Sequence, residues 1–191
     1  GIVMRKQQLV CLTALLFVSC QLVTSPASAA EGNPAKVAKS LQAWQQAKKK
    51  CSGNYSYSVR WQSFVGFGHE TTVVVTGNKV VERRYREFKR RPPAPVPNKP
   101  NVKPQPAGPL WVEKGKELGS HKKGAAAKTL DQLYQEATAV AKRKLPANER
   151  RYVRVDKQGL LLCCFTVDTR IADDAPTKGV NISSIQLGKA K

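Results

Sequence analysis

The sequence predicts an α+β domain in which an antiparallel sheet of about six strands carries two helices on one face. Two segments have helical spacing of apolar residues, and several others alternate between apolar and polar residues. Consecutive strands joined by short turns favour antiparallel pairing. The expected order is helix, three strands, a proline-rich insertion, helix, three strands. We expect the domain to cover residues 34–188, with the insertion at 91–128.

An export signal is expected over residues 1–30. Two cations precede an apolar stretch from Leu9 to Val23, which is too short to span a bilayer. Ala27-Ser28-Ala29 supplies the small residues that signal peptidase requires. The alternative is a lipoprotein, because Phe17-Val18-Ser19-Cys20 resembles a lipobox. The mature chain is therefore expected to be periplasmic or secreted, or lipid-anchored through Cys20.

The first predicted helix runs from Pro34 to Lys50. Val37, Leu41 and Trp44 follow one another at spacings of four and three, so they share one face. Three lysines end the segment, where cations suit the negative end of the helix dipole.

Three antiparallel strands are predicted next. From Tyr55 to Gln62, aromatic and aliphatic residues alternate with polar ones, which is typical of a half-buried strand. Thr71 to Thr76 is rich in β-branched residues, and Lys79 to Phe88 returns after it. Gly77-Asn78 between them suits a two-residue hairpin turn because both residues tolerate positive φ.

The insertion at 91–128 contains most of the 12 prolines of the chain. Proline lacks a backbone donor and fixes φ, so we expect this piece to stay out of the sheet as extended or low-order chain.

The second helix is predicted to begin at Leu130. Thr129-Leu130-Asp131-Gln132 has the pattern of a capping box, and apolar residues at helical spacing follow it. Strands are expected at Tyr152 to Asp156, Leu160 to Val167 and Val180 to Leu187, the second of them apolar on both faces like a central strand.

Lysine and arginine number 33 against 13 acidic residues, a net charge of +20, which favours solubility and attraction to polyanions. The densest basic cluster is interleaved with two aromatic rings and comprises Arg83, Arg84, Arg86, Lys89, Arg90 and Arg91. One interpretation is a polyanion-binding site, in which cations bind phosphates and rings stack on bases. The other is an edge strand whose charges prevent pairing with other chains. For an exported protein, an anionic envelope polymer or another exported protein is the expected partner.

Cys51, Cys163 and Cys164 remain after removal of the signal. Export exposes them to an oxidising compartment, so a disulfide from Cys51 to Cys163 or Cys164 is expected. Only one of the adjacent pair can face Cys51, because neighbouring residues of a strand point to opposite faces. The spacing of these cysteines with His69 or His121 does not match a zinc site, so no metal is expected.

Several short motifs occur together in a characteristic order: Tyr55-Ser56-Tyr57, Gly77-Asn78-Lys79-Val80, Thr129 to Tyr134, Tyr152 to Asp156, and Thr166-Val167-Asp168. In this order the chain resembles domain-of-unknown-function family 6174, small secreted or lipoprotein domains of bacteria. The resemblance covers roughly Trp44 to Leu187 apart from the insertion. It implies the fold and export, and it carries over no catalytic residue.

The sequence contains no recognisable catalytic or cofactor motif. We therefore expect a non-enzymatic binding module of the cell envelope or secreted fraction, with no cofactor. The alternatives are a polyanion-binding protein using Arg83 to Arg91, an enzyme with an unrecognised site, and a secreted inhibitor. A pocket joining His69, Glu70 and Asp168 would favour the enzyme, and a flat sheet bordered by arginines would favour binding.

Overall fold

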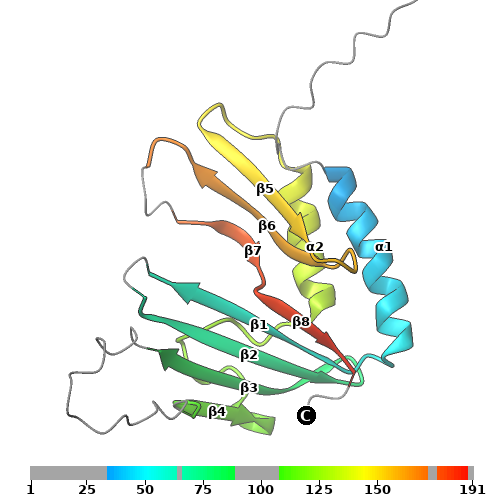
Figure 1. The fold of residues 1–191 in the computed structure, drawn as a ribbon, viewed down its shortest axis with the longest axis vertical. Coiled ribbons are helices and arrows are strands. Elements are labelled where there is room, and N and C mark those ends of the chain that lie inside the picture. The colour runs from blue at the N-terminus through cyan, green and yellow to red at the C-terminus, as the bar shows by residue number, and fades with distance from the viewer. Residues whose placement is uncertain (1–33, 64–65, 89–107, 172–175, 189–191) are drawn as a thin grey trace, which may run out of the picture.

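The computed structural model describes residues 34–63, 66–88, 108–171 and 176–188. The predicted signal at 1–30 lies outside these residues. The described chain forms α1 (Pro34–Lys50), β1 (Tyr55–Gln62), β2 (Gly68–Thr76), β3 (Lys79–Phe88), β4 (Trp111–Lys114), the 3-10 turn η1 (Gly115–Glu117), α2 (Leu130–Lys142), β5 (Glu149–Val155), β6 (Leu161–Asp168), β7 (Lys178–Asn181) and β8 (Ser184–Leu187). The two helices lie side by side along one side of the sheets (Figure 1).

The strands form two sheets, one with the order β4-β3-β2-β1-β8 and one with the order β5-β6-β7. All neighbours pair antiparallel. The predicted α+β class, the two helices and the antiparallel pairing are confirmed. The single sheet of about six strands is replaced by sheets of five and three strands.

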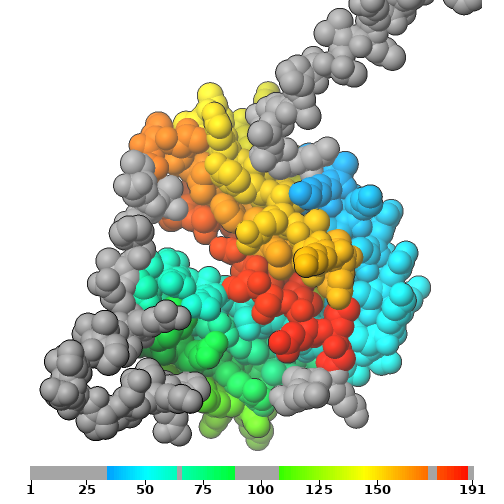
Figure 2. Space-filling view, in the orientation of Figure 1, coloured from blue at the N-terminus to red at the C-terminus, as the bar shows by residue number. Residues whose placement is uncertain are grey.

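The predicted last strand, Val180 to Leu187, is divided because the chain changes partners within it. The Ile182 N–H donates to the Leu162 carbonyl at 2.6 Å, and the next N–H, that of Ser183, donates to the Ser58 carbonyl at 2.7 Å. β7 therefore belongs to the small sheet and β8 to the large one. In the space-filling view β8, in red, lies at the boundary between the two sheets (Figure 2).

The structure corrects the predicted insertion at 91–128. Trp111–Lys114 forms β4, which pairs with β3 and makes β3 an inner strand instead of an edge. β4 is possible because Pro109 is the last proline of the predicted insertion. Every residue of the strand therefore keeps its backbone N–H donor. Residues 91–107 of the predicted insertion lie outside the described residues.

One hydrophobic cluster draws on both halves of the chain. It includes Val37 and Trp44 of α1, Leu130 of α2, Val73 of β2 and Leu161 of β6, each at most 1% exposed. The apolar stripes predicted for the two helices are the faces that they bury. The capping box of α2 is confirmed, as both of its hydrogen bonds are present.

Buried tyrosines connect these elements through their hydroxyl groups. The Leu130 N–H donates to the Tyr55 hydroxyl and the Leu161 N–H to the Tyr134 hydroxyl, each at 2.9 Å. The Tyr57 hydroxyl donates to the Lys128 carbonyl at 2.7 Å. Burial raises the pKa of Tyr55 to about 12, so the hydroxyl stays neutral. The helix cap and the loop before it are thereby fixed to the core.

The β2–β3 turn has the predicted conformation. Gly77 and Asn78 have φ values of 55° and 67°. Two consecutive residues with positive φ match the twist of a two-residue hairpin.

Candidate functional site

Five rings in successive contact cross the large sheet; three of the contacts are stacked, and that of His69 with Tyr85 is tilted at 32°. The rings are Trp61 on β1, His69 on β2, Tyr85 on β3, Trp111 on β4 and His121 after η1, with successive centroids 5.6, 5.5, 5.1 and 4.4 Å apart. The last two contacts are nearly parallel, at 7° and 6°. We call this set the ring column. Aromatic contacts of this kind add about 0.5–1.5 kcal/mol per pair beyond burial, so they favour the observed ring positions.

Strand register builds the ring column. Trp61 lies opposite His69, and Tyr85 lies opposite Trp111. His69 reaches Tyr85 diagonally, since Tyr85 itself lies opposite Thr71. The alternation of β1 that the sequence predicts therefore places Trp61 on the same face as the buried Tyr55 and Tyr57, beyond them along the strand.

A buried ion pair lies beside the ring column on the same face of the sheet. The Arg83 guanidinium donates from Nε to Glu113 Oε2 at 2.8 Å and from Nη2 to Oε1 at 2.7 Å. The side chains are only 3% and 1% exposed. The guanidinium carbon also lies 4.7 Å from the Trp111 ring centroid. This bidentate geometry is the strongest form of an arginine–carboxylate contact.

The ion pair also holds the loop between η1 and α2. Glu113 accepts from the Gly119 N–H at 2.7 Å, the His121 N–H at 2.6 Å and the Ser120 hydroxyl at 3.1 Å. Arg83 donates to the His121 carbonyl at 2.7 Å, and to a second loop carbonyl, that of Ala125, at 2.8 Å. The loop is thus fastened to the sheet at several points.

These hydrogen bonds decide the charge of Glu113. Burial by itself would raise the pKa of the carboxyl group, but the bonds from Arg83 and from the N–H groups of His121 and Gly119 outweigh it. The pKa of Glu113 is therefore held well below its usual value of 4.5, and the group is a carboxylate at neutral pH.

Ser120, His121 and Glu113 contain the residue types of a catalytic triad in a different arrangement. The Glu113 carboxylate lies 2.9 Å and the Ser120 hydroxyl 3.4 Å from the same nitrogen of His121, Nδ1. A triad needs the nucleophile on one imidazole nitrogen and the acid on the other. The group is therefore a structural connection between β4 and the loop.

The structure does not bring His69, Glu70 and Asp168 together in one pocket, the arrangement that would have favoured an enzyme. His69 belongs to the ring column, whereas Glu70, the next residue on the strand, binds Arg86 at 3.0 Å on the opposite face. Asp168 ends β6 in the small sheet, where Arg170 binds it at 2.6 Å. Among the described residues, no three His, Cys, Asp or Glu side chains gather where a metal ion could bind.

The basic cluster is largely neutralised where the structure describes it. Arg83 is buried with Glu113 and cannot reach a polyanion. Arg84 is ion-paired with Glu82 and Arg86 with Glu70. Lys89, Arg90 and Arg91 lie outside the described residues.

The cysteines are free in the structure, and the expected disulfide from Cys51 to Cys163 or Cys164 is not formed among the described residues. The Cys164 thiol faces α2, where it donates to the Ala137 carbonyl at 3.3 Å, and burial raises its pKa to about 11. Cys51 instead follows α1 directly, with its thiol 3.5 Å from the Lys48 carbonyl. The two thiols therefore have different local partners.

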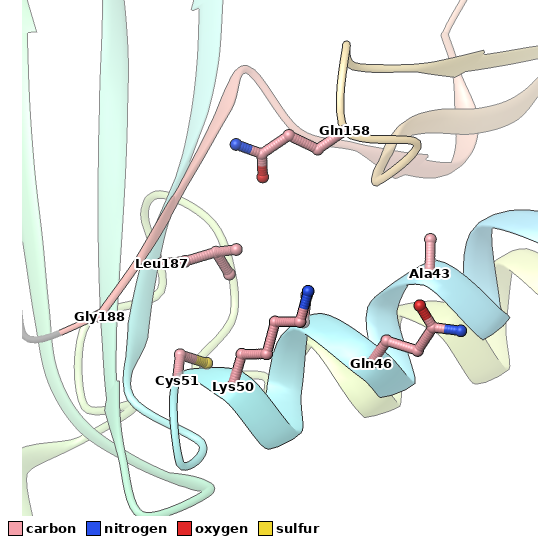
Figure 3. Close-up of a pocket in the computed structure, with 8 residues that line it drawn as sticks. Ala43, Gln46, Lys50, Cys51, Gln158, Leu187 and Gly188 are labelled. Atoms are coloured by element: carbon pink, nitrogen blue, oxygen red, sulfur yellow. The ribbon is translucent and has the colours of Figure 1, made fainter.

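Cys51 lines a cavity of about 500 Å³ between α1, the β5–β6 turn and the end of β8. Lys50 and Gln158 extend toward its interior from opposite sides (Figure 3). A smaller cavity of about 150 Å³ lies between the two sheets, where Val59, Leu133 and Val180 face one another.

Four exposed apolar residues lie at or near the same end of their strands. Trp61 and Phe67 are each 49% exposed, Leu110 is 64% exposed and Ile171 is 47% exposed. We call these four residues the strand-end rim. The antiparallel order places the end of β1, the start of β2, the start of β4 and the end of β6 on the same side of the molecule (Figure 1).

The ring column ends in this rim. Trp61 stacks on His69 and also contacts Phe67, with centroids 5.8 Å apart. Sequence analysis missed Phe67 and Leu110 as surface residues, and placed Trp111 and Glu113 in the insertion. Trp111 to Lys114 has two apolar residues followed by two charged ones, so it does not alternate, and four residues are too few to distinguish a strand from a loop.

No protein-family model, curated protein or solved structure matches the chain. Within the described residues, no helix has the length and apolar character needed to cross a membrane. We therefore infer the function from the geometry of the described residues.

Proposed function

We propose that this protein is an exported, non-enzymatic binding module of the bacterial envelope or secreted fraction, and that the strand-end rim is its contact surface. The observation that carries the proposal is the exposure of Trp61 and Phe67, each 49%. Trp61 stacks on His69 of the ring column, and Phe67 contacts Trp61. Tryptophan and other aromatic anchors dominate binding energy at protein contact surfaces. A preorganised ring also loses little side-chain freedom on binding.

Two further features support binding over catalysis. The polar groups nearest to a catalytic arrangement, Ser120, His121 and Glu113, are engaged in fastening the loop to β4. Export is supported by the signal-like pattern of residues 1–30. The module needs no cofactor for this role.

The experiment compares two double variants of the full chain, produced in a secreting bacterial host. Trp61→Ser/Phe67→Ser removes the rim rings. Tyr152→Ser/Leu187→Ser is the matched control, because these residues are 40% and 38% exposed and lie outside the rim. We measure the affinity of each protein for an isolated envelope fraction.

We expect the rim variant to bind at least about 30-fold more weakly, since loss of an aromatic anchor costs about 2 kcal/mol or more. The control should bind like the unchanged protein. Equal binding by both variants would refute the rim as the contact surface.

A further inference from the structure

The strand-end rim has the chemistry of a membrane-interface anchor. We infer that its partner is the surface of an anionic phospholipid bilayer, into which Trp61, Phe67, Leu110 and Ile171 insert shallowly. This inference rests on the proposed function and names the partner class for the same surface. Tryptophan is favoured at the bilayer interface, and exposed Leu, Ile and Phe side chains gain by entering the acyl boundary.

The shape of the rim fits a broad surface better than a single groove. Its residues come from three separate connections: the β1–β2 hairpin, the segment leading into β4, and the turn after β6. These three regions lie on the same side of the molecule (Figure 1). The four rim side chains can enter a bilayer interface together. A single protein groove would need a separate subsite for each of them.

The charges beside the rim favour an anionic surface. Three described carboxylates at this end of the strands are ion-paired: Glu70 with Arg86, Glu87 with Lys123 and Asp168 with Arg170. Asp173 and Asp174, which follow Ile171 in the sequence, lie outside the described residues. Arg60 and Lys178 stand beside the rim on β1 and β7, both exposed.

Arg60 remains available as a cation. Its described partners are uncharged, namely the Gln62 side chain at 2.9 Å and the Phe88 ring, whose centroid is 4.3 Å away. With a net charge of +20 on the whole chain, the protein is drawn to anionic headgroups before the apolar residues make contact.

The test uses a site-specific crosslinker in the full chain. Phe67→p-benzoylphenylalanine keeps an aromatic ring at the rim, and Tyr152→p-benzoylphenylalanine is the matched control on the outer face of the small sheet. Each protein is irradiated with vesicles of phosphatidylcholine and phosphatidylglycerol (3:1), with vesicles of pure phosphatidylcholine, and with a bacterial envelope fraction. Mass spectrometry identifies the adducts.

We expect lipid adducts at position 67 with the anionic vesicles, reduced at least about tenfold in pure phosphatidylcholine and by 0.5 M salt. Arg60→Gln/Lys178→Gln should reduce them severalfold. Equal lipid adducts at positions 67 and 152 would overturn the inference, because attachment of the protein to the vesicle through another part of the chain would give the same result. Adducts at position 67 with an envelope protein only would overturn the lipid inference and leave the proposed function standing. No adduct at position 67 under any condition would overturn both.

Discussion

Replacing Glu113 by glutamine tests whether the buried ion pair with Arg83 stabilises the packing of β4, and of the loop between η1 and α2, on β3. The substitution keeps the side-chain size and removes the negative charge. Both partners are nearly fully buried, so Arg83 would keep its charge with only carbonyl dipoles around it.

The expected cost is about 3 kcal/mol. Breaking a buried pair by removing one partner typically costs 3–5 kcal/mol, because the remaining charge is uncompensated. We take the lower value since two backbone carbonyls still accept from Arg83. In a protein of this size that corresponds to a fall in Tm of about 6–12 °C.

Urea denaturation of the full chain measures the effect. Glu136→Gln is the matched control, since it makes the same chemical change in an ion pair with Lys128 whose side chains are 42% and 40% exposed. That control should cost less than about 1 kcal/mol. The double variant Arg83→Met/Glu113→Gln should lose at least about 1 kcal/mol less than the sum of the two single variants. Strict additivity, or equal losses for Glu113→Gln and Glu136→Gln, would refute the reasoning.

The same pair predicts a dependence of stability on pH. The pKa of Glu113 is lower in the folded protein than its usual value of 4.5, so the carboxylate stabilises the fold above pH 4.5. That contribution is lost as the pH falls below 4.5 toward the folded pKa. The difference in unfolding free energy between the unchanged protein and Glu113→Gln should therefore narrow between pH 5 and pH 3. A constant difference would contradict the assignment.

Three other predictions follow from the core and the cap. Thr129→Ala should lower the unfolding free energy by about 1 kcal/mol through loss of the capping box, and Thr129→Asn should restore most of it; equal stabilities would argue against the cap. Tyr134→Phe should cost about 1–3 kcal/mol, because the Ser40 hydroxyl and a backbone N–H lose a buried partner; a neutral result in thermal denaturation would contradict this. Iodoacetamide should label Cys51 well before Cys164, whose pKa is raised to about 11. Peptide mapping checks this order, and equal rates would show that Cys164 is accessible.

Much of the fold could be predicted because its signals are local. The helix starting at Leu130 follows from its cap and the spacing of its apolar residues, and the hairpin at Gly77-Asn78 follows from two residues that tolerate positive φ. The alternation from Tyr55 to Trp61 predicted the buried positions of Tyr55 and Tyr57 correctly, but Ser56 is buried as well and Trp61 is 49% exposed. Each of these features depends on neighbours within about one turn or one strand.

Two elements were not predictable in this way. β4 has only four residues and follows a proline-rich stretch, so its identity depends on pairing with β3. The break between β7 and β8 depends on a change of partner strand, from Leu162 to Ser58, which no local pattern encodes.

In the candidate site, too, some features follow from local sequence and others only from tertiary structure. The sequence by itself determined that Trp61 shares a face with Tyr55, that the chain is strongly basic, and that Arg83 lies in a cluster of cations with aromatic neighbours. Only the tertiary structure decided that Arg83 is buried against Glu113 and that Trp61 and Phe67 remain exposed at the rim. Periodicity fixes the side of a strand on which a residue lies, because it follows from backbone geometry. Whether that position is buried or exposed depends on which distant segment covers it.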